Sequence, residues 1–321
     1  MAHNLNIVNG KASMMYVKEA PWHGLGTRLE KLATSEEAME VANLGFTVVK
    51  APLKAVVANG MVNVAGRFAT VRTDTNDVLG VVGSRYTIVQ NKDAFRFFDG
   101  LVGEGEAMYE TVGALGLGEK IWILAKLPSY IRVNGDDIVD KYLLLSNSHD
   151  GSSIIRAKLT PIRVVCHNTL SMALQGAEQE VRIRHTASAE ERLEVGHKII
   201  GLSNVLYNDL AEIFQQMAVV KVTNAQLVDY VKTLVPDNEL AENHTRTENI
   251  RAKILELHEV GAGSNMSRGT AWGAYNAVTE YTDHVYTTTA VDKKLESVWF
   301  GVGAKLKVEA FDLAKTLAGL N

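Results

Sequence analysis

The first half of the chain alternates apolar and polar residues with a period of two, which is the period of a β-strand. Runs rich in β-branched and aromatic residues predict strands at 46–49, 55–58, 62–71, 78–89, 109–112, 120–126, 142–146, 154–159 and 181–185. Asn59-Gly60, Asn76-Asp77 and Asn134-Gly135 separate several of these runs and favour tight hairpin turns. The pattern therefore predicts an antiparallel sheet built from hairpins.

Two short helices are expected among these strands. Thr34 or Ser35 can cap the first helix, and Glu37 completes a capping box from Thr34. Asn91 can cap the second helix, which carries three phenylalanines as far as Phe98. The first 186 residues are therefore predicted to form an α+β domain, with an antiparallel β-hairpin sheet and accompanying helices.

Two stretches inside this domain contain residues that restrict the backbone. The segment from Gly113 to Gly118 fits neither the Walker A nor the dinucleotide-binding pattern, because it lacks Gly-Lys-Ser/Thr and a strand follows it. Glycine tolerates positive φ, so a plain hairpin turn is predicted there. Pro161 disfavours a helix at the residue before it, so segment 161–175 is expected to begin extended and to become helical.

Beyond Ser188 the apolar period becomes helical, and Ser188 with Glu191 forms a capping box. A stripe with a mean spacing near 3.5 comprises Val195, Ile199, Leu202, Leu206, Leu210, Ile213 and Met217. Later helices are predicted at 224–234, 239–260, 270–285 and 305–317, with a Gly/Ser loop at 261–269. The fold class is thus α+β, with residues 187–321 as an all-helical C-terminal region. Because the stripe belongs to a long helix, a homo-oligomer is expected.

Composition narrows the class of protein. The chain has 321 residues, of which 46% are hydrophobic and 22% charged, and this is enough apolar material for a sizeable core. A formal charge of −4 excludes a globally basic nucleic-acid coat and leaves room for a local basic stripe. With Cys166 as the one cysteine, no signal peptide and no run of 18 apolar residues, we expect a cytoplasmic protein of a bacterial host, without a membrane segment.

No catalytic machinery is recognised in the sequence. Cys166-His167-Asn168 has the residue types of a cysteine protease, but consecutive side chains point apart, so a structural role is favoured. The histidines show no metal-binding spacing, and His149-Asp150 sits at a Gly-containing turn. Asp136-Asp137 and Asp140 follow Asn134-Gly135 and indicate a solvated turn. The chain is therefore predicted not to be an enzyme, with no catalytic residues, no metal and no cofactor.

The segment 151–175 contains basic residues and no acidic one, and further arginines follow it before the helical region. The candidate nucleic-acid-binding residues are Arg156, Lys158, Arg163, Arg182 and Arg184. Alternating Arg156 and Lys158 project from one strand face, as do Arg182 and Arg184, and this could form a groove that follows a phosphate backbone. The alternative is a solvated outer face with scattered ion pairs, and both interpretations stay open at this point.

Trp272 and Tyr275 lie at helical spacing and are expected to pack between helices, whereas Tyr86, Tyr109, Trp122 and Tyr130 could stack on bases or belong to the core. Three segments are informative in combination: Pro21-Trp-His-Gly-Leu-Gly26, the run from Pro161 to Leu170, and Trp272 with the run from Asn276 to His284. Together they resemble the phage/plasmid-like family filed as domain of unknown function 932, over nearly the whole chain.

The resemblance implies a role in DNA metabolism or in conflict with host defence, and it brings no catalytic residues. The leading hypothesis is an oligomeric protein that binds single-stranded DNA and anneals strands in DNA recombination. It rests partly on analogy with ring-forming annealing proteins, which also combine a hairpin sheet with helices. The alternative is a protein-binding antagonist of a host defence system that has no affinity for nucleic acid. An enzyme acting on nucleic acid would need a carboxylate cluster that the sequence lacks.

Overall fold

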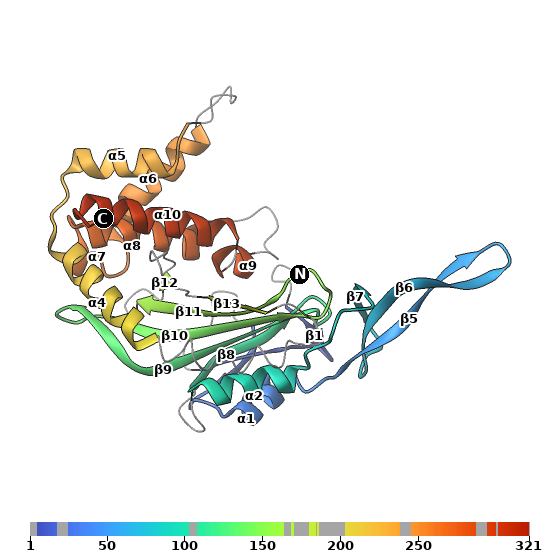
Figure 1. The fold of residues 1–321 in the computed structure, drawn as a ribbon. Coiled ribbons are helices and arrows are strands. Elements are labelled where there is room, and N and C mark those ends of the chain that lie inside the picture. The colour runs from blue at the N-terminus through green and yellow to red at the C-terminus, as the bar shows by residue number, and fades with distance from the viewer. Residues whose placement is uncertain are drawn as a thin grey trace.

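The computed structural model describes residues 5–17, 25–102, 108–163, 168–169, 180–183, 185, 203–237, 245–286, 294–299 and 301–320. The chain is an α+β protein with antiparallel hairpins in its first part and helices in its C-terminal part (Figure 1). In the view of Figure 1, helices α1 (Ser35–Val41) and α2 (Asn91–Val102) lie below the largest sheet, and the C-terminal helices lie above it. The predicted fold class is confirmed.

The largest sheet has the order β12-β11-β10-β9-β8-β3-β4, and β13 also pairs with β11. Only β3 and β4 run parallel; the other neighbours in this sheet are antiparallel. Its strands are β3 (Met14–Val17), β4 (Thr27–Leu29), β8 (Met108–Leu115), β9 (Lys120–Asn134), β10 (Asp137–Ser148), β11 (Ile155–Arg163), β12 (Asn168–Thr169) and β13 (Glu180–Ile183). Strands β1 (Ile7–Val8) and β2 (Lys11–Ala12) form a separate small hairpin.

A second sheet consists of β5 (Val48–Val57), β6 (Gly60–Arg72) and β7 (Val78–Gly83). Strand β7 pairs only with residues 67–71 of β6, so residues 53–66 continue as a two-stranded ribbon, here called the arm. The sequence predicted two strands at 46–49 and 55–58, whereas β5 is continuous through Pro52. Proline is tolerated there because β5 is an edge strand and the register shifts between Pro52 and Lys54.

Local signals predicted several other elements correctly. The side chain of Thr34 accepts from the backbone of Glu37 and the side chain of Glu37 accepts from the backbone of Thr34, which is the predicted capping box of α1. The hairpin turns at Asn59-Gly60 and Asn134-Gly135 are present. The glycines between β8 and β9 form a plain turn, with Gly116 at φ +62° and Gly118 at φ +107°. Strand β11 runs through Pro161, so the residues from there onward begin extended, as expected. The expected change to a helix within 161–175 is wrong at Asn168–Thr169, because these residues pair with β11 as strand β12.

The C-terminal part contains the predicted helices, of which α5 (Asn224–Leu234) has the predicted ends. The ends are shifted for α4 (Ser203–Val219), α6 (Thr245–Val260), α8 (Ala271–Glu280) with the π-helical turn (Tyr281–Val285), and α10 (Val302–Leu317). Helix α9 (Lys294–Trp299) was not predicted. The prediction of a loop throughout 261–269 was wrong, because the short helix α7 (Ser264–Ser267) forms there after Gly263, which takes a left-handed φ of +73°. Of the 3.5-spaced stripe, the part before Ser203 lies outside the described residues, and Leu210 and Met217 are buried. The boundary between residues 186 and 187 stays a prediction.

Two apolar cores hold these layers. The smaller core contains strand residues on one face of the large sheet, including Tyr16, Trp122, Leu124, Tyr142 and Leu144. The larger core contains the strand residues that alternate with those of the smaller core, and it joins the sheet to α1, α2 and the C-terminal helices. Within the described ranges, no helix is long and apolar enough to cross a membrane.

In the larger core, Trp272 and Tyr275 of α8 are fully buried and contact Phe214 of α4 and Phe311 of α10. The prediction that they pack between helices is confirmed. Tyr109 and Trp122 are also buried, so they do not offer an open stacking face, while Tyr130 is half-exposed and Tyr86 is partly buried.

Candidate functional site

Three of the five predicted basic residues lie close together at one edge of the large sheet. Arg156 of β11 stands directly opposite Arg182 of β13, and Lys158 stands opposite Glu180. Arg156 and Lys158 alternate with Ile155 and other core residues, so both project from the sheet face that carries the smaller core. Like charges opposite each other on neighbouring strands repel, so an anion bound beside Arg156 and Arg182 would be stabilised.

The exposure of these residues differs from the sequence-based expectation of open strand charges. Arg182 is exposed, whereas Arg156 and Lys158 are only partly exposed. Arg163 lies at an odd-numbered position of β11, opposite Val139 and Asn168. Arg156 and Lys158 lie at even-numbered positions, which belong to the other face of the strand. Arg184 lies outside the described residues. The structure therefore brings together Arg156, Lys158 and Arg182.

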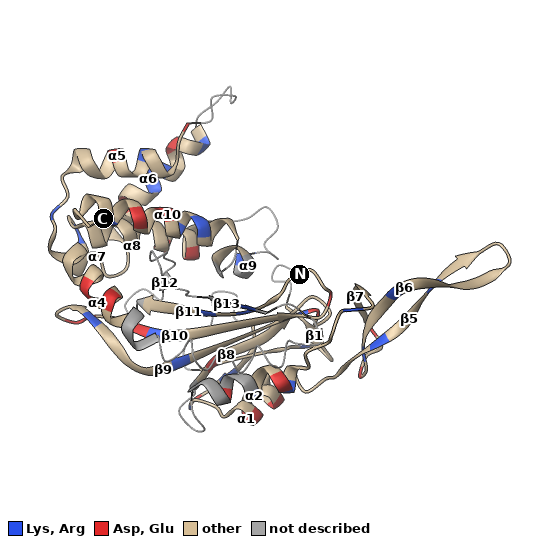
Figure 2. Ribbon diagram, viewed as in Figure 1, with Lys and Arg blue, Asp and Glu red and all other residues tan. Residues whose placement is uncertain are grey.

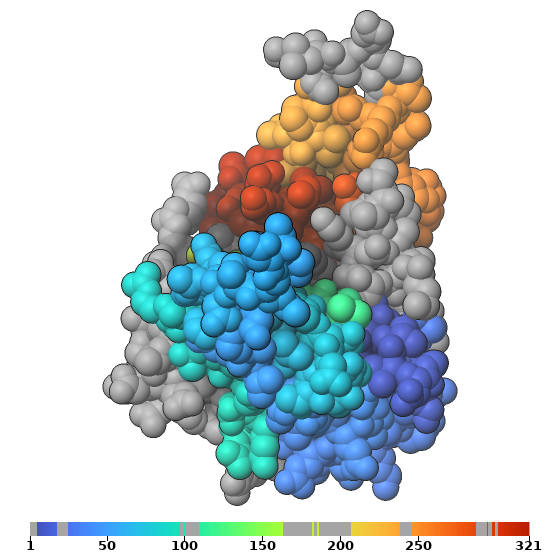
Figure 3. Space-filling view, turned by 90° about the vertical axis from the view of Figure 1, so that its right-hand side faces the viewer, coloured from blue at the N-terminus to red at the C-terminus, as the bar shows by residue number. Residues whose placement is uncertain are grey.

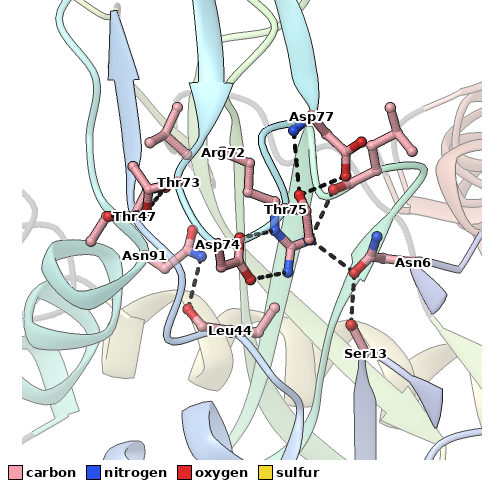
Figure 4. Close-up of polar contacts among 12 residues, drawn as sticks. Asn6, Ser13, Leu44, Thr47, Arg72, Thr73, Asp74, Thr75, Asp77 and Asn91 are labelled. Atoms are coloured by element: carbon pink, nitrogen blue, oxygen red, sulfur yellow. Dashed lines mark hydrogen bonds and ion pairs between the residues drawn. The ribbon is translucent and has the colours of Figure 1, made fainter. Parts of the chain in front are cut away.

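A buried arginine that the sequence analysis did not single out lies where β6 ends (Figure 4). Arg72 is fully buried, and its Nε and Nη2 donate to the two carboxylate oxygens of Asp74 at 2.8 and 2.9 Å. Its Nη1 donates to Asn6 Oδ1 at 3.0 Å and to the carbonyl of Leu117 at 2.8 Å. The hydrogen bonds from Arg72 hold the pKa of Asp74 below its usual value. The arginine thus ties β6 to the N-terminal segment and to the β8–β9 turn.

The guanidinium also stacks on an aromatic ring. The central carbon of Arg72 lies 3.8 Å from the ring centroid of Phe46, a cation–π contact in a site without water access. Gly118 completes the site, because a Cβ there would meet Arg72 Nη1 at 2.7 Å. The sequence signal that could have revealed this cluster is an arginine inside an apolar strand run, two residues before an aspartate.

A pocket of about 700 Å³ opens beside this cluster, at the root of the arm. Its lining combines apolar side chains with two carboxylates and includes Ile7, Val8, Leu79 and Leu117 together with Asp77 and Glu119. The volume is in the range of pockets that hold small molecules or protruding side chains. The residues of this pocket come from the N-terminal hairpin, the β6–β7 connection and the β8–β9 turn, which lie far apart in the sequence.

His149, which the sequence placed with Asp150 at a Gly-containing turn, is fully buried. Asn91 donates through Nδ2 to the carbonyl of Leu44 at 2.9 Å, so its Oδ1 accepts from His149 Nε2, also at 2.9 Å. This bond assigns the imidazole proton to Nε2. Burial lowers the pKa of His149 to about 3, so the ring is neutral at pH 7. The predicted Gly-containing turn is present, with Gly151 at φ +75°, and the ring of His149 is buried within it.

A second histidine lies near His149. The Nδ1 of His185 donates to the carbonyl of Thr87 at 3.1 Å, and its ring stacks on Tyr86 at a centroid distance of 4.6 Å. Burial lowers the pKa of His185, and the neighbouring Asp150 opposes that shift. Within the described part of the chain, neither His149 Nδ1 nor His185 Nε2 has a hydrogen-bond partner. The described residues contain no group of three or more His, Cys, Asp or Glu that could hold a metal.

The family-like segment in the helical part contains a buried ion pair. Lys307 Nζ lies 2.7 Å from Asp283 Oδ1, and both side chains are almost completely buried. Asp283 belongs to the π-helical turn, and such turns within helices frequently occur at functional sites. Burial lowers the pKa of Lys307, and Asp283 counteracts that shift. Burial likewise lowers the pKa of Lys294, against the same carboxylate.

Asp137 corrects another prediction. The sequence indicated a solvated turn for Asp136-Asp137 and Asp140, but Asp137 is fully buried, and its Oδ2 accepts from Trp272 Nε1 at 2.9 Å. Asp140 lies next to Lys126 and forms a hydrogen-bonded ion pair with it. Only Asp136 is open to solvent. The three carboxylates therefore serve separate contacts and do not form a shared site.

Pro21 to Gly24, Cys166-His167 and Arg184 were singled out in the sequence and lie outside the described residues. That the protein has no catalytic residues and no cofactor stays a prediction.

The model of the family described as "Domain of unknown function (DUF932)" matches residues 78–299. The match covers Arg156, Lys158, Arg182 and both buried histidines, and it begins after the arm. Comparison with curated proteins and with solved structures finds no match.

Proposed function

The chain belongs to the DUF932 family, and we propose that this member is a phage- or plasmid-encoded oligomer that binds single-stranded DNA without sequence preference and promotes strand annealing. The observation that supports the proposal best is the register of β11 and β13, which places Arg156 directly opposite Arg182. A phosphate near both guanidinium groups would offset their repulsion and accept hydrogen bonds from both.

The distribution of charge supports the same ligand. Figure 2 marks basic residues on the ribbon of β9, β11 and β5–β6, and no acidic residue along the arm. Besides the buried Arg72, strands β5 and β6 carry Lys50, Lys54 and Arg67 without any carboxylate. Backbone-tracking proteins need such local positive surface even when the chain as a whole is acidic. The proposed contacts are to phosphates, so affinity would depend on salt and little on base sequence.

Titration of a labelled oligonucleotide of about thirty to fifty nucleotides at low salt tests the proposal. We expect binding at micromolar protein, and we expect Arg156→Glu with Arg182→Glu to weaken it by more than about tenfold. The matched control is Lys253→Glu, since Lys253 sits on helix α6 and pairs with Glu256 at 2.8 Å on the surface. The control should bind like the unchanged protein, because an exposed pair contributes little to folding.

A protein-binding antagonist of host defence is the second candidate, and the net charge of −4 favours it. Such a protein would ignore the oligonucleotide at every salt concentration. Absence of binding at micromolar protein, with the circular dichroism of the folded chain retained, would end the DNA proposal and favour the antagonist.

A further inference from the structure

The arm leaves the body of the protein as a ribbon without covering layers. It extends beyond β7 in Figure 1, and in the turned view of Figure 3 it stands out toward the viewer. Residues 53–57 of β5 lie in the arm, which corresponds to about 17 Å at 3.3 Å per residue. An isolated two-stranded ribbon is only marginally stable in water, so this length indicates that something else contacts it.

Both faces of the arm are apolar. Val56 stands opposite Met61, and these two side chains share one face with exposed fractions of 84% and 70%. Ala55 stands opposite Val62 on the other face. A ribbon that served only as a phosphate-tracking element would carry cations on one face, and the arm carries only Lys54. Exposed apolar surface of this kind marks a protein interface.

The root of the same arm holds the pocket described above. Val48 pairs with Arg72 at the root, and the pocket residues Asp77 and Leu79 follow Arg72 directly along the chain. The lining offers apolar contacts to the tip of an arm, and the carboxylates of Asp77 and Glu119 are opposite in charge to Lys54, the one charged residue of the arm. The whole chain carries −4, so the +1 of the arm leaves −5 for the rest. The sign of the charge therefore favours contact between an arm and the body of another copy.

We propose that two copies of this chain exchange arms, with each arm tip seated in the pocket at the root of the other copy's arm. Because tip and pocket lie at opposite ends of one ribbon, a two-fold axis between antiparallel arms satisfies both contacts at once and closes the assembly as a dimer. The outer edge of β5 in the arm pairs with no described strand, so the two arms can also form backbone hydrogen bonds with each other.

Light scattering without DNA tests the dimer. The unchanged protein should have twice the 35.1 kDa mass of one chain at micromolar concentration. Val56→Lys with Met61→Lys should give a single-chain mass, and so should Leu117→Lys in the pocket, because both changes place charge in the apolar contact. These side chains are exposed in one chain, with 49% exposure for Leu117, so the folded state should persist. Val219→Lys with Val260→Lys is the control, at 69% and 71% exposure in the helical part, and should remain a dimer.

Cross-linking tests the geometry in a Cys166→Ser background. Met61→Cys protein mixed with Leu117→Cys protein should form a disulfide-linked species of twice the chain mass, and neither protein alone should do so. A single-chain mass for the unchanged protein, or a dimer that survives both the arm and the pocket changes, would overturn the proposal. The result is independent of DNA binding, since Arg156→Glu with Arg182→Glu should leave the dimer mass unchanged.

Discussion

Trp272 Nε1 donates a 2.9 Å hydrogen bond to Asp137 Oδ2, and both side chains are buried. The two residues are 135 positions apart, one at the start of β10 and the other in the first turn of α8. The bond therefore attaches the helical part to the β9–β10 hairpin. It also explains why a carboxylate beside a surface turn is buried, because the indole satisfies one of its oxygens.

Replacing Trp272 with Phe should destabilise the protein by about 2–3 kcal/mol, because a hydrogen bond to a charged group is lost and the carboxylate of Asp137 stays buried. Urea unfolding followed by circular dichroism measures the change. Asp137→Asn keeps an acceptor for the indole and should cost less. Equal losses for the two variants would contradict a stabilising role for the hydrogen bond from the indole.

Removing one partner of the Asp283–Lys307 pair should destabilise the protein strongly, whereas replacing both partners with apolar side chains should change its stability little. Lys307→Met leaves Asp283 buried without its closest cation and should reduce the free energy of unfolding by about 3–5 kcal/mol. Asp283→Leu combined with Lys307→Met should recover most of that loss, because two apolar side chains need no compensation for lost hydration. A double-mutant cycle from urea unfolding would show a strong coupling energy. Additive losses would contradict a tight pair.

His149 should make folding sensitive to mild acid. Its pKa is about 3 in the folded chain and about 6.5 when exposed, so between these values only the unfolded chain binds the proton. Stability is then lost as pH falls below about 6.5, and near pH 5 the loss from this residue is about 2 kcal/mol. His149→Gln keeps an N–H donor for Asn91 and should lose about 2 kcal/mol less between pH 7 and pH 5 than the unchanged protein. An identical pH dependence would refute a buried neutral ring.

Arg182→Gln should change the salt dependence of DNA binding in a measurable way. Removal of one phosphate contact should reduce the slope of log affinity against log salt by about 0.7 for a single strand. Fluorescence anisotropy between about 50 and 200 mM salt gives that slope. Lys253→Gln serves as the control and should leave the slope unchanged. A loss of affinity with no change in slope would mean that Arg182 does not contact phosphate.

The amino-acid sequence by itself determined the elements whose signals are local. The capping box of Thr34 with Glu37 specified the start of α1, and the apolar period at 224–234 matched α5 at both ends. The Asn-Gly pairs predicted two hairpins that are present, although the loop residues are Ala58-Asn59 in one and Gly135-Asp136 in the other. These signals act within a few residues, so they can be recognised without knowledge of the rest of the chain.

Tertiary structure decided which distant residues meet. Alternation placed Arg156 and Lys158 on one face, but only the pairing of β11 with β13 set Arg182 opposite Arg156. Nothing local distinguished Asp137 from Asp136, and the first is buried because Trp272 reaches it. The sequence likewise predicted the strands of the arm, but only the pairing of β7 with residues 67–71 of β6 shows that residues 53–66 continue as a two-stranded ribbon. Strand pairing and burial depend on contacts across the whole chain, and for that reason the period of a segment predicts its conformation but not its neighbours.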